Sequence, residues 1–164
     1  MTRDTKALLA RRFLSVLSAP DESVVRSVTT DDMIWSFPGS SVISGEAHGV
    51  AGVMRRARTI AEHGVHVEIV RPIYGYSGVA ILLHNTGEKN GVVLDEHLAA
   101  VFSFRDDKIA RLDTFLSDVP MVEAFFGPSS TQRAAQSSQT GDVRHEPPKR
   151  ASDQLCHDSG DAHE

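Results

Sequence analysis

The residues best suited to acid–base chemistry lie in segment 92–104, which reads VVLDEHLAAVFSF. Alternation along a strand places Glu96 with Leu98 on one side and His97 on the other. The side that carries Glu96 is the more apolar of the two. A carboxylate among apolar neighbours loses part of its water, and a positioned carboxyl group serves as a general acid or base. Glu96 is therefore the leading catalytic candidate.

Two further titratable residues lie in neighbouring strand-like segments. His84 interrupts the apolar segment 78–86, and imidazole is the usual proton carrier near neutral pH. Asp113 lies in segment 108–116 and is a second carboxylate candidate. A lone histidine on a strand is more often a structural residue, so His84 has a catalytic and a structural interpretation, and both stay open.

Aromatic and aliphatic side chains offer apolar surface for a ligand. Two aromatic residues alternate in the strand-like segment MIWSF, and two tyrosines share one side of segment 65–76. Core packing explains aromatic residues in strands equally well. The candidate ligand-binding residues are Trp35, Phe37, Tyr74, Leu98 and Phe102.

Several classes of function do not fit the composition. The chain has 17 basic and 22 acidic residues, a formal net charge of -5 and no basic run, so a nucleic-acid partner is not expected. No apolar run approaches the roughly 18 residues of a membrane-spanning helix. Charged residues interrupt the first turns of the chain where a signal peptide would be apolar, so we expect a cytoplasmic protein.

Cofactor and metal sites are not expected either. The chain shows no phosphate-binding glycine loop, dinucleotide fingerprint or nucleophile motif. The single cysteine, Cys156, excludes an internal disulfide and a cysteine-based zinc site. Cys156 and His157 stand with acidic residues near the end of the chain, but mixed ligands without fixed geometry bind metals poorly.

The periodicity predicts helices followed mainly by strands. Residues at helical spacing predict helices at 4–19, 22–28 with Asp21 as N-cap, and 49–63, and a last helical turn at 119–126. Strands are expected at 33–37, 65–76, 78–86, 92–104 and 108–116. Short connections between the last four strands indicate antiparallel hairpins, and the whole is an α+β domain.

The chain changes character after Gly127. Residues 128–164 contain no Phe, Tyr, Trp, Ile or Met, so they cannot bury enough apolar surface to offset the entropy of ordering. We expect one folded domain at 1–127 and a disordered polar tail at 128–164 that is dispensable for stability.

This order of elements resembles the SnoaL-like branch of the nuclear transport factor 2-like superfamily, over about residues 4–127. The resemblance rests on SAPDESVVRSVTTDDMIWSFPG, on the lead-in Gly45 to Gly49 of the third helix, and on FSFRDDKIARLDTFLSD. It implies a cone-shaped, curved antiparallel sheet that encloses an apolar cavity with three N-terminal helices. It also implies that Ala100, and with it Glu96, faces the cavity.

The resemblance also limits the reactions that the chain is expected to catalyse. Ketosteroid isomerases of this superfamily use a base and two oxyanion-hole groups, and the matching positions here are Phe37, Phe13 and Ala100. Steroid isomerisation by that mechanism is therefore excluded. Limonene-epoxide hydrolases and polyketide cyclases use an acid on the last strand, which matches Thr114 here, one place after Asp113. Since one residue turns a side chain to the other face, only a bulge would bring Asp113 inside.

The leading hypothesis is a SnoaL-like enzyme that needs no cofactor and transfers protons on an apolar, oxygenated small molecule, by cyclisation, isomerisation, dehydration or epoxide opening. The alternative is a non-catalytic protein that holds a hydrophobic ligand in the same cavity. The mixed side of segment 92–104 that carries His97 also suggests a homodimer that forms through the sheet.

Overall fold

The computed structural model describes residues 1–129 of the chain. Its elements are α1 (Arg3–Leu14), the 3₁₀ helix η1 (Ser15–Leu17), α2 (Glu22–Val28), β1 (Thr29–Phe37), β2 (Gly45–His48), α3 (Gly49–Glu62), β3 (His66–Tyr74), β4 (Gly78–Lys89), β5 (Val92–Arg105), β6 (Lys108–Leu116) and α4 (Val119–Phe126). From residue 130 on, the expected polar tail lies outside the described residues and stays a prediction. Within the described part, no helix has the length and apolar character needed to cross a bilayer.

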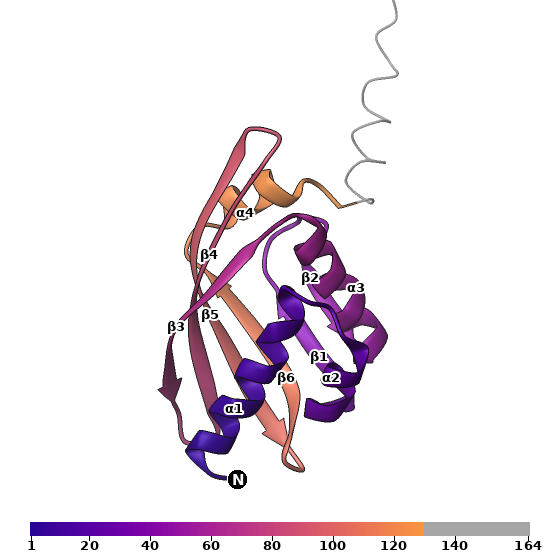
Figure 1. Ribbon diagram of the computed structural model, residues 1–164, viewed down its shortest axis with the longest axis vertical. Coiled ribbons are helices and arrows are strands. Elements are labelled where there is room, and N and C mark those ends of the chain that lie inside the picture. Colours follow the sequence, from indigo (N-terminus) through magenta and orange to yellow (C-terminus); the bar gives the residue numbers. More distant parts are fainter. Residues whose placement is uncertain (130–164) are drawn as a thin grey trace, which may run out of the picture.

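The strands form one curved sheet in the order β2-β1-β6-β5-β4-β3, as Figure 1 shows. The predicted α+β cone is confirmed, with one correction: the sheet is mixed, because β1 and β6 pair in parallel. The other neighbouring strands pair antiparallel. Strands β1 and β6 are far apart in the sequence and are not connected by a hairpin. The long connection between them allows the two strands to run in the same direction.

Two tight turns fix the register of the central strands. Asn90 and Gly91, between β4 and β5, have φ angles of 53° and 78°, and Asp106 and Asp107, between β5 and β6, have 51° and 59°. Two consecutive residues with positive φ are typical of hairpin turns that match the twist of paired strands. The resulting ladder between β4 and β5 runs without a register shift from Gly78 to Lys89.

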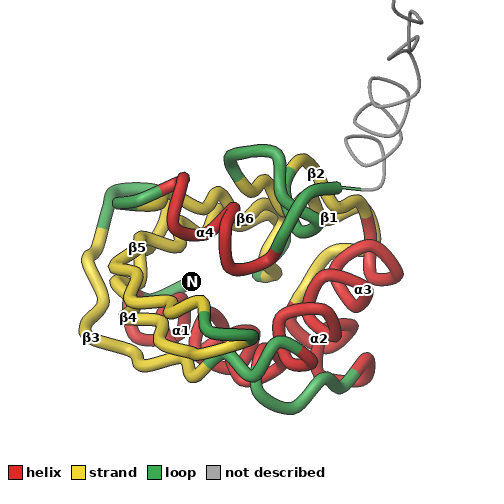
Figure 2. Tube along the Cα trace, turned by 90° about the horizontal axis from the view of Figure 1, so that it is seen from above, coloured by secondary structure: helices red, strands yellow, loops and turns green. Residues whose placement is uncertain are grey.

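The helices fill the concave side of the sheet, which curls around them when the molecule is seen from above (Figure 2). Phe13 on α1 is fully buried, and its ring meets Trp35 of β1 and Phe102 of β5 edge-on, with centroid distances of 5.8 and 5.9 Å. The predicted N-cap Asp21 is confirmed, because its side chain accepts a hydrogen bond from the Ser23 amide. The core therefore joins α1 to both halves of the sheet.

Arg56 is a charged residue of α3 that lies inside the protein. It is 7% exposed, and its guanidinium donates to the carbonyls of Trp35 at 2.5 Å and Gly45 at 2.9 Å. Its guanidinium carbon also lies 5.0 Å from the centre of the Trp35 ring. Burial lowers the pKa of Arg56 to about 10. The arginine thus ties α3 to β1 and β2.

Strand β2 is not among the strands that the sequence pattern predicts. It has only four residues, of which only Ala47 is buried, so it carries too little alternation to be recognised in sequence.

Helix α4 closes one end of the cone and is fastened at several points. Asp118 caps it by accepting a hydrogen bond from the Met121 amide at 2.9 Å. Glu123 accepts bonds from the amide and hydroxyl of Ser40, at 2.7 and 2.8 Å. Beyond the helix, Pro128 still pairs with Ser41.

Candidate functional site

A pocket lies between the concave face of the sheet and the helices. Its enclosed volume is about 30 Å³. Most lining side chains are aliphatic or aromatic, and the polar ones gather on neighbouring strands. The polar or partly polar members are Trp35, Asn85, Glu96 and Thr114. An apolar pocket with a few convergent polar groups is the usual form of a small-molecule site.

Glu96 lies on the inner face of β5 and is 1% exposed, as the alternation of this strand predicts. Its Oε1 accepts hydrogen bonds from the Ser117 amide at 2.5 Å, the Ser117 hydroxyl at 3.1 Å and the Asp118 amide at 3.3 Å. Its Oε2 has one contact, to the Asp118 amide at 3.2 Å. Oε2 is therefore the oxygen with more capacity to accept a proton or a ligand bond.

Asn85 stands directly opposite Glu96 on β4. Its Oδ1 is buried and has no hydrogen-bond partner among the described residues. A buried acceptor without a partner costs free energy, which a ligand donor would recover. The sequence interpretation missed Asn85, although it occupies the inward position of the series Val79, Ile81, Leu83 that strand alternation defines.

Thr114 is a further polar residue of the pocket and lies opposite Ala100 on β5. It is 8% exposed, and its hydroxyl oxygen accepts a hydrogen bond from the Trp35 indole N–H at 3.0 Å. The hydroxyl proton stays available as a donor. The pocket lining thus includes a carboxylate, an unpaired amide oxygen and an oriented hydroxyl.

The structure brings only some of the predicted ligand residues to this pocket. Trp35, Phe37 and Leu98 line it, as does Ala100. Phe102 lies deeper on β5 under α1 and is fully buried outside the lining. Tyr74 ends β3 at the open edge of the sheet and is 43% exposed. The positions of Phe102 and Tyr74 along their strands place both residues outside the pocket. The alternation of side chains, on which the sequence prediction rested, does not give this position.

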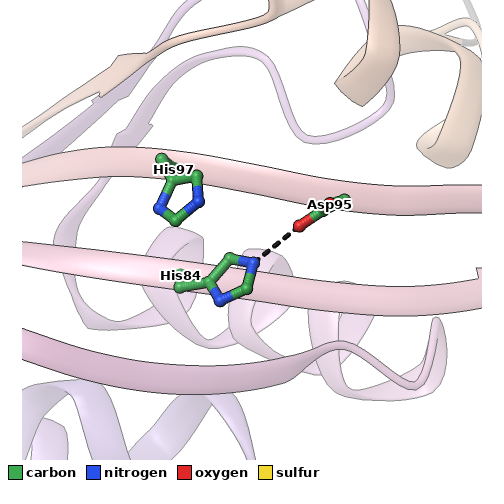
Figure 3. Close-up of side chains that lie close together, drawn as sticks. All are labelled: His84, Asp95 and His97. Carbon is green, nitrogen blue, oxygen red and sulfur yellow. Dashed lines mark hydrogen bonds and ion pairs between the residues drawn. The ribbon is translucent and has the colours of Figure 1, made fainter.

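His84 lies on the opposite, outer face of the sheet. Its Nε2 shares a hydrogen bond of 2.6 Å with Asp95 Oδ1, and its ring stacks on His97 with centroids 4.2 Å apart (Figure 3). The bond to Asp95 raises the pKa of His84 above its ordinary value, and nearby Glu68 acts in the same direction. The sheet therefore separates His84 from Glu96.

Asp113 also lies on the outer face. It accepts hydrogen bonds from Ser36 at 2.6 Å and from Arg111 at 2.8 Å. Burial acts to raise the pKa of Asp113, but these bonds outweigh it and lower the pKa below its ordinary value. The pairing is regular at this residue, since Val101 pairs with Asp113 and Ala100 with Thr114, and the ladder shifts its register only between Ser103 and Phe104. Thr114, and not Asp113, therefore faces the pocket.

The comparisons with known proteins agree with this architecture. A family model of the SnoaL-like domain matches residues 10–112. No curated protein matches the chain.

Solved structures share the fold at low sequence identity. Bal32a, from a soil-derived mobile gene cassette, superposes with a TM-score of 0.69 at 20% identity, covering 76% of this chain and 98% of that one. A nuclear transport factor 2-like protein of Burkholderia xenovorans LB400 gives 0.67 at 14%, covering 77% and 99%. A protein of Jannaschia sp. CCS1, provisionally described as a SnoaL-like polyketide cyclase, gives 0.61 at 16%, covering 76% and 94%.

Proposed function

The chain belongs to the SnoaL-like domain family, and from this premise we propose that it catalyses proton transfer on an apolar, oxygenated small molecule without a cofactor. The observation that carries the proposal is Glu96, the one carboxylate among the described residues that line a mainly apolar pocket. A positioned carboxylate in a site with little water is suited to take a proton from a substrate and return it.

Each polar group that lines the pocket has a proposed role. Glu96 Oε2 is the proposed proton acceptor, since Oε1 already receives three hydrogen bonds. Asn85 Oδ1 would accept a bond from a substrate hydroxyl, and the Thr114 hydroxyl would donate to a substrate oxygen. Cyclisation, isomerisation, dehydration and epoxide opening all need this combination of proton acceptor and oxygen-binding groups.

The substrate would need room that the pocket lacks in this conformation. Its 30 Å³ compares with roughly 300–1,000 Å³ for typical ligand sites. Val122 and Phe126 of α4 are among the lining residues, and they lie on the element that closes the cone. We infer that a substrate enters by displacing side chains of α4, which would then cover it during the reaction.

The experiment that tests this function first identifies the ligand of the pocket. The protein purified from its own host is analysed by native mass spectrometry, because an apolar site of this kind retains a compound whose mass identifies it. The compound is then incubated with fresh protein. Conversion to an isomer or a dehydrated or hydrated product supports the proposal, and a compound recovered unchanged contradicts it.

The second candidate is a binding protein that holds a hydrophobic ligand without converting it. The hydrogen bonds of Glu96 favour it, because bonds to the amides of Ser117 and Asp118 fix the turn before α4 and give the carboxylate a structural role. Under this alternative the retained compound stays unchanged, and replacement of Asn85 by Leu weakens its binding because the partner of a ligand donor is lost.

We further propose that two copies of the chain associate through the outer face of the sheet. A groove of about 340 Å³ lies on this face between Val70, Ala99 and Phe115. Phe115 on the middle strand β6 is 59% exposed, and Val70 on the edge strand β3 is 52% exposed, so large apolar side chains on this face are open to solvent. A second copy related by a two-fold axis would cover the same residues on both chains.

We expect light scattering at micromolar concentration to give twice the chain mass of 17.8 kDa. Replacing Phe115 by Glu should yield monomers, because it places a charge in the apolar centre of the interface. The matched control is Leu8→Glu, which changes a similarly exposed apolar residue on α1 and should leave the dimer intact. A monomeric wild-type chain contradicts the proposed dimer.

A further inference from the structure

A cluster of metal-ligand side chains lies on the outer face of the sheet. His84 on β4 and His97 on β5 are directly opposite each other, and Asp95 is two residues before His97 on the same side. Each residue offers a nitrogen or oxygen atom, and these atoms lie within 4.8 Å of one another. Figure 3 shows the two rings face to face, with Asp95 beside His84. Three side chains of two ligand types that bind transition metals, imidazole and carboxylate, thus lie close together.

We propose that His84, His97 and Asp95 form a surface site for a divalent transition-metal ion, with Zn²⁺ as the ion it fits best. Two imidazoles and one carboxylate are a common zinc ligand set, which leaves one position for water. The hard ions Mg²⁺ and Ca²⁺ prefer oxygen ligands throughout, so the two imidazoles disfavour them.

Binding of an ion requires only a small change in the distances between the three ligand atoms. Zinc bonds of about 2.0–2.1 Å in a tetrahedral site place two ligand atoms roughly 3.4 Å apart. The cluster atoms lie within 4.8 Å, and the rings stack with an interplanar angle of 8°. Binding one ion therefore needs the two rings to tilt toward a common point, while the backbone ladder that carries them stays in place. The hydrogen bond between His84 Nε2 and Asp95 would be replaced by bonds to the ion.

A neighbouring carboxylate supports the arrangement. Glu68 on β3 is paired with His84, and its Oε2 lies 3.7 Å from His84 Nδ1, the ring nitrogen that does not contact Asp95. Zinc-binding histidines almost always give their second N–H to such an acceptor, which fixes the ring and strengthens the ligand. The strands therefore supply both the ligands and an outer partner in a row from β3 to β5.

In the single chain the site is open to solvent, with His97 at the border of the groove proposed for the dimer, and it is separate from the acid–base pocket. The side chain of Asp95 is 66% exposed and that of His84 27% exposed. Glu96, between Asp95 and His97 in the chain, points through the sheet to the opposite face. The ion would therefore not contact the proposed proton acceptor. The sequence interpretation expected no metal site, because the pairing of His84 with His97 depends on a strand register that spacing alone does not give.

The test is isothermal titration of the full-length, chelator-treated chain with ZnCl₂, together with its thermal unfolding with and without the ion. We expect one strong site per chain and a higher melting temperature with Zn²⁺. Loss of an outer partner typically costs 10–100-fold in affinity, so we expect about this loss for Glu68→Gln and a larger one for His97→Asn. Asp95→Asn provides a second ligand variant in case His97→Asn unfolds.

Two controls separate this cluster from other ligands in the chain. His48→Asn alters an exposed histidine on β2, at the other end of the sheet, and should bind zinc like the wild type. The double variant Cys156→Ser/His157→Asn removes potential ligands near the end of the chain and should also keep the strong site. Wild-type affinity in His97→Asn and Asp95→Asn, loss of the site in the Cys156/His157 variant, or no zinc binding by the wild type would each overturn the proposal.

Discussion

Replacing Glu96 by Gln is expected to lower turnover of the pocket's substrate by about 10²–10⁴, the usual contribution of a positioned acid or base. Gln keeps the length and shape of the side chain, and its carbonyl oxygen can still accept the Ser117 amide bond that Oε1 accepts now. It loses the ability to take a proton. Substrate affinity should change little, because the apolar walls of the pocket are untouched. The measurement is steady-state kinetics with the compound identified from the protein.

The control for this variant is Glu88→Gln, the same change at an exposed residue near the tip of the β4–β5 hairpin. It should keep wild-type turnover. A melting curve for each variant is needed, because the Gln amide group can face the Asp118 amide that now bonds to both carboxylate oxygens. Full turnover in Glu96→Gln, with loss of turnover in His84→Ala or Asp113→Asn, would contradict the role of Glu96 and move the reaction to the outer face.

The prediction for Glu96 depends on which side of β5 each residue occupies, and strand alternation together with the family resemblance at Ala100 gave this side. Glu96, Leu98 and Ala100 all point inward because the β4–β5 ladder has no register shift that would exchange the faces. The helices could also be recognised, since each has an apolar stripe or an identifiable cap, such as Asp21. The sequence pattern was therefore informative where the environment of a residue depends on its own helix or strand alone.

Other features depend on partners that are distant in the sequence. The stacking of His84 on His97 follows from the register between two strands, and a shift of one residue would separate the rings. The burial of Arg56 depends on the carbonyls of Trp35 and Gly45, which no helical pattern reveals. Asn85 becomes notable only because its oxygen faces a pocket without a partner. Whether a buried polar atom has a hydrogen-bond partner depends on the assembled fold. The sequence therefore predicted where residues lie in their helices and strands better than what those residues do.

The largest expected effect on stability is that of Phe13→Ala, about 3–5 kcal/mol in the free energy of unfolding. Phe13 is completely buried, and its ring meets Trp35 and Phe102 edge-on. Removal of the ring loses its transfer free energy and two aromatic contacts, and it leaves a cavity between α1 and the sheet that the paired strands cannot close. Because the free energy of unfolding of a domain is roughly 5–15 kcal/mol, this change should remove a large part of the stability.

Urea unfolding followed by circular dichroism measures this loss, with Leu8→Ala as the matched control on the same helix. Leu8 is 64% exposed, so its truncation should change the free energy by less than about 0.5 kcal/mol. A loss below about 1 kcal/mol for Phe13→Ala would mean that α1 closes into the vacated space or is not part of the cooperative core. A loss of the expected size supports a rigid packing of α1 behind Trp35, whose indole N–H donates to Thr114 in the pocket.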